Sequence, residues 1–162
     1  MIRLLLLLSF LALFFPTIGV ADEFGTRDEA VQMVARVEAL VAHEGMPAAI
    51  EAINEQKPEF KIKDLYPFIY TLDGLNVAHG ANVKMVGKSW INTKDQDGNY
   101  LIRSMVSVVN SPARSGWVNY KWPDPISHKI LDKSAFVKRL DDTHFVGVGV
   151  YSRSHNAVTT SK

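Results

Sequence analysis

The sequence predicts an α+β domain built around a five-stranded antiparallel sheet. Three observations predict this class. Apolar residues recur at helical spacing near the start of the domain, strand formers then gather in five short segments, and turn residues separate neighbouring segments. Segregated helices and strands of this kind are typical of α+β domains. The 162 residues suit one domain and leave little room for two.

Residues 1–21 have the three parts of a secretory signal peptide. Arg3 supplies the positive charge, residues 4–15 are apolar except for Ser9, and Gly19 and Ala21 place small residues before the expected cleavage point. The apolar run falls short of the ~20 residues that a membrane-spanning helix needs. We therefore expect cleavage after Ala21 and localisation in the periplasm. An uncleaved N-terminal anchor is the alternative.

A helix is predicted to begin after Thr26. Thr26 and Glu29 fit a capping box, in which the hydroxyl accepts the Glu29 amide and the Glu29 carboxylate reaches back. Apolar residues then follow one helical face at positions 30, 33, 34, 37, 40 and 41. Gly45 suits a helix end, and Pro47 suits the first turn of a second helix that ends before Pro58. The segment is therefore either two helices or one long helix broken at residues 45–47.

Five strands are predicted in the remainder of the chain. Strand formers at 66–71 and 76–79 flank the turn signal Asp73-Gly74, which predicts a hairpin. Residues 83–86 allow one helical turn, and apolar residues repeat at helical spacing between 101 and 109. Strands are then expected at 117–122, 133–140 and 144–153. The polar tail, residues 154–162, is expected to be flexible, which leaves residues 22–153 as the domain.

Composition and motifs argue against several functional classes. A formal net charge of +1 lacks the basic excess typical of nucleic-acid-binding proteins. Without cysteine, a disulfide framework, a thiolate metal site and a cysteine nucleophile are excluded. The histidines show no metal-ligand spacing, and residues 95–99 fit a turn better than a calcium loop. Hydrolase and phosphate-loop motifs are absent. We expect no enzyme, no cofactor, no metal and no nucleic acid partner.

Two features of the strands suggest a site. Gly147 and Gly149 lie on one face of the last strand, where they leave room either for a closely packed helix or for a small ligand pocket. Aromatic residues share single strand faces at 66, 68 and 70 and at 120 and 122. Such clusters are more often core than site, but buried tyrosine hydroxyls need polar partners. Together with a lysine and a histidine, they are able to hold a carboxylate inside an apolar cup.

An ordered set of motifs resembles a known family. The segments that carry the resemblance are 64–70 (DLYPFIY), 73–74 (DG), 78–82 (AHGAN), 86–88 (VGK), 95–100, 116–123 (GWVNYKWP) and 145–151 (FVGVGVY). Over residues 27–153 the sequence resembles the single Cache domain type 2 family (sCache_2). The resemblance implies a long N-terminal helix packed on a PAS-like five-stranded antiparallel sheet, and a role in extracytoplasmic sensing of small molecules, commonly short carboxylic acids.

The resemblance also implies a ligand-binding set, carried over by position: Phe68, Tyr70, His79, Tyr120, Trp122 and Lys133. His79 occupies the Ala-His position of the family, and Tyr120 and Trp122 occupy its Tyr-x-Trp-Pro motif. Lys133 is expected to counter the charge of a small organic acid, while Tyr120 and His79 donate hydrogen bonds. The remaining aromatic side chains are expected to exclude water.

The resemblance bears on partners as well. Most family members continue into a transmembrane helix and a chemotaxis or kinase module, whereas this sequence ends soon after the domain. We therefore expect a separate membrane partner, a sensor kinase or a chemoreceptor, to receive the signal. The alternative is a structural or interaction subunit of a periplasmic complex that has kept the fold and lost the ligand.

Overall fold

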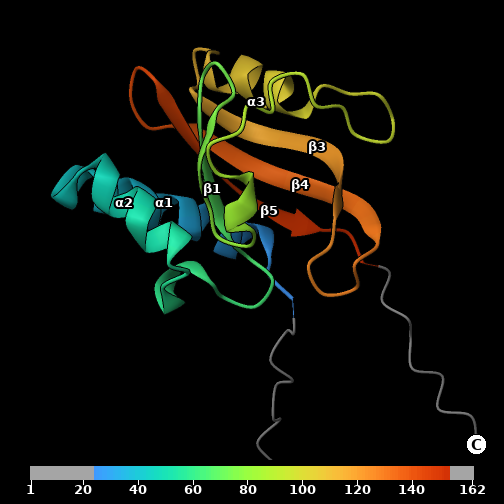
Figure 1. Ribbon diagram of the computed structural model, residues 1–162, viewed down its shortest axis with the longest axis horizontal. Helices are drawn as coiled ribbons and strands as arrows, with labels where there is room; N and C mark the ends of the chain where they lie inside the picture. The colour runs from blue at the N-terminus through green and yellow to red at the C-terminus, as the bar shows by residue number, and fades with distance from the viewer. Residues whose placement is uncertain (1–23, 154–162) are drawn as a thin grey trace, which may run out of the picture.

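The computed structural model describes residues 24–153, and the predicted signal peptide and polar tail lie outside this range. Three α-helices and five strands follow one another in the order that the sequence predicts (Figure 1). The helices are α1 (Arg27–Glu44), α2 (Met46–Asn54) and α3 (Leu101–Val109), and the strands are β1 (Pro67–Thr71), β2 (Asn76–His79), β3 (Ser115–Pro123), β4 (Ile130–Arg139) and β5 (His144–Tyr151). Within the described range, none of the helices combines the length and the apolar character that crossing a membrane requires.

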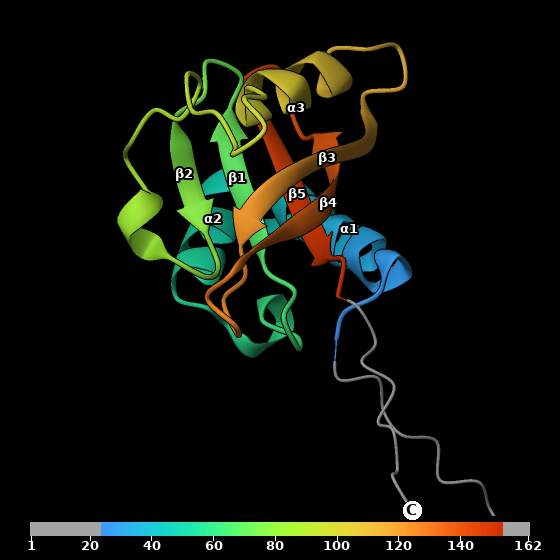
Figure 2. The same cartoon turned by 90° about the vertical axis from the view of Figure 1, so that its right-hand side faces the viewer.

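The five strands form one antiparallel sheet in the order β2-β1-β5-β4-β3. The last strand of the sequence, β5, therefore lies at the centre, between the N-terminal hairpin β1–β2 and the hairpin β3–β4 (Figure 2). This arrangement confirms the predicted α+β class. β4 begins three residues before the expected Lys133, because Ile130 and Leu131 pair with the end of β3 at Pro123 and Trp122.

The N-terminal helices form as their capping residues predict. Thr26 accepts the Glu29 amide at 3.2 Å, and Glu29 accepts the Thr26 amide at 2.8 Å, which completes the capping box. α1 ends at Gly45, whose φ of 89° lies in the left-handed region that favours glycine. Pro47 then occupies the first turn of α2. The segment is therefore two helices, and the alternative of one broken helix is wrong.

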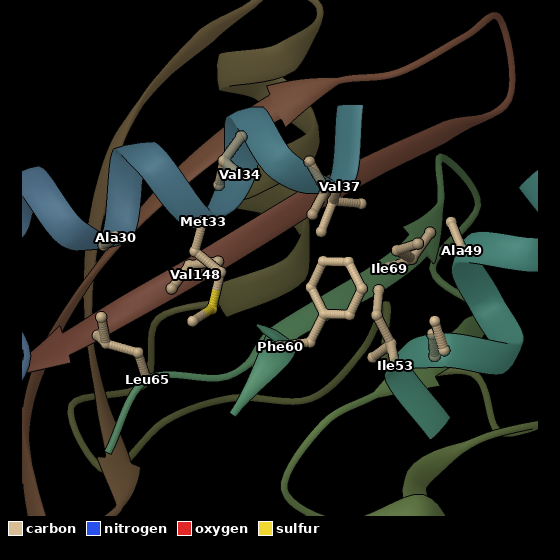
Figure 3. Close-up of a cluster of buried hydrophobic side chains, with 13 residues drawn as sticks. Ala30, Met33, Val34, Val37, Ala49, Ile53, Phe60, Leu65, Ile69 and Val148 are labelled. Carbon is tan, nitrogen blue, oxygen red and sulfur yellow. The ribbon is translucent and has the colours of Figure 1, made fainter. Parts of the chain in front are cut away.

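Helices cover both faces of the sheet. α1 buries its predicted apolar face against Ile69 of β1 and Val148 of β5, and α2 packs on the same side of the sheet (Figure 3). On the opposite face, α3 packs on aromatic and apolar side chains of β1, β3, β4 and β5. Because side chains alternate along a strand, each central strand contributes to two separate cores. The predicted binding residues all belong to the face that α3 covers.

Candidate functional site

A narrow cavity lies between α3 and the sheet, and all six predicted site residues line it. Three side chains of α3, Leu101, Ile102 and Met105, close the cavity opposite the strands, and Tyr66 completes the lining. Its volume is about 10 Å³ when counted as the space open to the centre of a water molecule. That is room for about one water. The cavity therefore exists, and in this conformation side chains fill almost all of it.

The alternation of side chains along each strand, together with the pairing of the strands, brings these residues together from distant parts of the sequence. Phe68 and Tyr70 project from β1, and His79 lies at the end of β2 directly opposite Phe68. Tyr120 of β3 lies opposite Lys133 of β4. Two hairpins that are not neighbours in the sheet thus place their aromatic and charged side chains on one face, on either side of the central strand β5.

Lys133 is the charged centre of the cavity. Its residue is only 2% exposed, although a lysine is almost never fully buried unless it is paired. The ammonium donates to the hydroxyl of Tyr66 at 2.6 Å and to that of Tyr151 at 3.3 Å. It also lies over the two rings, 4.1 Å and 4.5 Å from their centroids. Among the ion pairs of residues 24–153, none involves Lys133.

The two glycines of β5 make room for side chains of the cavity itself. A methyl group added at Gly149 would lie 2.2 Å from the Cε atom of Lys133, and one at Gly147 would lie 2.3 Å from the ring of Phe68. No helix atom is among the nearest neighbours of either position. The expectation of a closely packed helix is therefore wrong here. The missing side chains allow the cavity lysine and an aromatic wall residue to approach the central strand closely.

His79 is held as a neutral hydrogen-bond donor. Its Nδ1 accepts the backbone amides of Ala81 at 3.3 Å and Asn82 at 3.0 Å, so the ring proton resides on Nε2. Burial, together with the nearby positive charge of Lys133, lowers the pKa of His79 to about 3. The imidazole is therefore uncharged at neutral pH, and its remaining N–H is available to an acceptor in the cavity or in the hollow that His79 also lines.

Tyr70 and Tyr120 of the cavity are also protonated at neutral pH. Burial raises the pKa of Tyr70 and that of Tyr120 above the ordinary value of 10. Tyr120 packs edge-on against Trp122, with ring centroids 6.2 Å apart, and Tyr70 packs edge-on against Phe68 at 5.7 Å. These aromatic contacts form the apolar wall of the cavity.

Two residues that contact the cavity lysine were absent from the predicted set. Tyr66 and Tyr151 contact the ammonium of Lys133, and their hydroxyls lie 3.0 Å from each other. Both carry a sequence signal, because each continues a same-face series of its strand, Tyr66 with positions 68 and 70 and Tyr151 with positions 147 and 149. The three cavity residues of α3 follow helical spacing, which by itself indicates only a buried face.

A wider hollow of about 340 Å³ adjoins the cavity, with which it shares Tyr66, His79 and Trp122. Its outer side is formed by part of the β3–β4 loop, including Asp124, Pro125 and His128. The β3–β4 loop therefore borders the hollow that lies next to the cavity. Across residues 24–153, no three His, Asp or Glu side chains converge in a way that would hold a metal ion.

Comparisons with known proteins agree on one kind of domain. The family model described as single Cache domain 2 matches residues 25–162. Over 90 residues the chain is 38% identical to the sensor histidine kinase MctS of Rhizobium johnstonii, a match that covers 55% of this chain and 19% of the kinase. The chain thus spans about a fifth of that relative.

Solved structures give the same result. The periplasmic sensor domain of a chemotaxis protein is 26% identical, with a TM-score of 0.61 and coverage of 78% of this chain and 90% of that domain. A Cache chemosensory domain, described in terms of carboxylic acid recognition, is 28% identical, with a TM-score of 0.61 over 78% and 88% of the two chains. A methyl-accepting chemotaxis protein of Vibrio parahaemolyticus shares the fold, at 21% identity and a TM-score of 0.63 over 75% and 82%.

Proposed function

The chain belongs to the single Cache domain 2 family, and on that premise we propose that it is an extracytoplasmic sensory domain whose cavity binds a short-chain carboxylate. The domain resides in the periplasm and passes its bound state to a membrane sensor kinase or chemoreceptor. The relatives support this proposal through their own descriptions as a sensor kinase, a periplasmic chemotaxis sensor domain and a domain that recognises carboxylic acids.

The buried ammonium of Lys133 is the observation that carries the proposal. A buried charge is costly unless an opposite charge pairs with it, and the described part of the chain supplies only tyrosine hydroxyls and rings. A carboxylate in the cavity supplies the missing negative charge. The Nε2–H of His79 and the hydroxyl of Tyr120 add neutral donors. An amine, in contrast, meets a like charge and a ring N–H.

The size of the cavity limits the acid to a small one. Room for about one water means that even acetate requires some opening between α3 and the sheet. The carboxylate end faces the ammonium, whereas Leu101, Ile102 and Met105 offer only apolar surface to the rest of the ligand. Acids of two or three carbons therefore fit with the smallest movement of α3.

A thermal-shift screen of the purified chain tests the proposal. Acetate, propionate, pyruvate, lactate and larger acids are compared with amino acids and amines at equal ionic strength. An acid at about 100 times its dissociation constant adds ~2.7 kcal/mol to the free energy of unfolding, which is several degrees for a domain of this size. A shift with small acids alone is expected. A folded protein that responds to none of these acids would contradict the proposal.

The narrowness of the cavity favours one alternative, a ligand-free interaction subunit of a periplasmic complex. In that case the aromatic cluster and α3 form an ordinary core, and Lys133 contributes only through its tyrosine contacts. Replacing Lys133 separates the two functions. Under the proposal the substitution abolishes acid binding, whereas under the alternative neither the wild type nor the variant binds an acid.

A further inference from the structure

A second buried charge cluster consists of Arg153, Asp64 and Asp124, and none of these residues lines the cavity. The guanidinium of Arg153 donates to Asp64 through one nitrogen and to Asp124 through the other. Both carboxylates are buried, at 4% and 1% exposed. Within residues 24–153, neither forms an ion pair with another cation. One arginine therefore pairs with two buried acids that come from distant segments.

Each acid organises a different part of the chain. Asp124 begins the β3–β4 loop, and its Oδ2 atom accepts the amide of Ser127 at 3.0 Å and its hydroxyl at 2.7 Å. This loop lines the hollow beside the cavity. Asp64 precedes β1, and its Oδ1 atom accepts the amide of Gly25 at 2.6 Å, just before α1. Arg153 thus joins the loop that lines the neighbouring hollow to the segment just before the first helix.

Both ends of the described chain meet at this cluster. Arg153 follows β5, and its guanidinium lies over the ring of Phe24, 4.1 Å from the centroid. Figure 2 shows the start of the described chain close to the end of β5, in agreement with this contact. Arg153 therefore contacts the start of the described chain from its end.

The cluster is also linked to the cavity. The hydroxyl of Tyr151 accepts from Lys133 and donates to the carbonyl of Pro123 at 2.8 Å, one residue before Asp124. The ring of Tyr151 lies 5.1 Å from the guanidinium of Arg153. A carboxylate that draws the ammonium away from the tyrosine hydroxyls acts next to the cluster.

We propose that Arg153, Asp64 and Asp124 form a latch, in which Arg153 is a positioning residue that couples the conformation of the β3–β4 loop to the first and last described residues of the domain. Each carboxylate holds the guanidinium in the place that the other needs, and loss of either leaves a buried charge less well paired. The coupling exists without any ligand. Its use in sensing rests on the proposed function.

Amide hydrogen exchange of the ligand-free chain tests the coupling. The two readouts are the Ser127 amide in the loop and the Gly25 amide before α1. Asp124→Asn should accelerate exchange at Gly25, and Asp64→Asn should accelerate exchange at Ser127, each by at least about tenfold, which corresponds to one lost charge-assisted hydrogen bond. Unchanged or slower exchange at the distant amide would overturn the latch.

Two further variants make the result specific. Asp141→Asn is the matched control, because Asp141 accepts the amides of Thr143 and His144, each at 2.7 Å, in the β4–β5 turn; it should leave both readouts unchanged. Arg153→Lys keeps the charge and loses the two-pronged geometry, so both readouts should accelerate together. This second variant decides the question if either acid variant fails to fold, and acceleration of only one readout would overturn the latch.

Propionate then separates the latch from the proposed function. If propionate raises the melting temperature and slows exchange at both Ser127 and Gly25, the latch serves in sensing. If propionate binds and exchange at Gly25 does not change, the sensing role of the latch is refuted while the proposed function stands. If propionate does not bind, the ligand-free comparison still decides whether the coupling exists.

Discussion

Replacing Lys133 with methionine removes the cavity charge with little change in shape. Methionine fills a similar volume and has no polar atom that needs a strong partner. The hydroxyls of Tyr66 and Tyr151 remain 3.0 Å apart, and Tyr151 still donates to the carbonyl of Pro123. No buried hydroxyl is left without a partner. We therefore expect the free energy of unfolding of the ligand-free variant to stay within about 1 kcal/mol of wild type.

The effect on acid binding should be large. A buried charge-assisted contact contributes about 3 kcal/mol, so its loss weakens binding about 100-fold. At an acid concentration of about 100 times the wild-type dissociation constant, wild type gains ~2.7 kcal/mol and the variant only ~0.4 kcal/mol. At about 3–4 °C per kcal/mol for a domain of this size, the expected shifts in Tm are roughly 10 °C for wild type and 1–2 °C for the variant.

The assay is a thermal melt with and without propionate, with Lys138→Met as the matched control. Lys138 lies on the same strand, but it forms an ion pair with Glu38 of α1 at 2.7 Å, away from the cavity. The control should keep the full propionate shift. The reasoning is refuted if Lys133→Met responds to propionate as strongly as wild type, or if the ligand-free variant no longer folds cooperatively.

Three further predictions concern the same cavity. Burial places the folded-state pKa of His79 at about 3. As the pH falls below 6.5, the imidazole therefore becomes protonated in the unfolded chain before it does in the folded domain, which favours unfolding. Relative to His79→Gln, wild type should lose about 2 kcal/mol of stability between pH 7.5 and pH 5, and a pH-independent difference in urea unfolding would contradict this. Gly149→Ala, whose methyl would lie 2.2 Å from the flexible end of the cavity lysine, should abolish the propionate shift with little loss of stability. Gly147→Ala, whose methyl meets an aromatic ring, should instead lower the free energy of unfolding by about 1–3 kcal/mol; equal effects of the two variants in melts with and without propionate would count against this assignment. Met105→Ala should enlarge the apolar end of the cavity at about 2–5 kcal/mol of stability and move the largest thermal shift to a longer acid, and an unchanged ranking of acids would remove Met105 from the ligand's surroundings.

The sequence predicts the fold well where signals are local. The capping box at Thr26, the glycine stop at Gly45 and the Asp73-Gly74 turn each depend on a few neighbouring residues, and each is present in the structure. The start of β4 was predicted three residues late, because pairing across the β3–β4 hairpin extends that strand. Sheet order was not predicted at all, since it depends on contacts between segments that lie far apart in the sequence.

The same distinction applies to the site. Family motifs identified six residues that line one cavity, whereas their roles as ligand contacts stay a prediction. The sequence alone could not show which side chains Gly147 and Gly149 accommodate, because those side chains come from β1 and β4. The Arg153 cluster was missed for a similar reason, since Asp64 and Asp124 carry no local pattern that points to a shared arginine.

The position of the carboxylate decides whether this domain binds acids through its buried lysine. Crystals of the protein soaked in sodium propionate should show the carboxylate at about 2.7–2.9 Å from the Nζ atom of Lys133, with the alkyl group toward α3. Propionate bound elsewhere, or a cavity that holds only water at saturating acid, would contradict the proposed function.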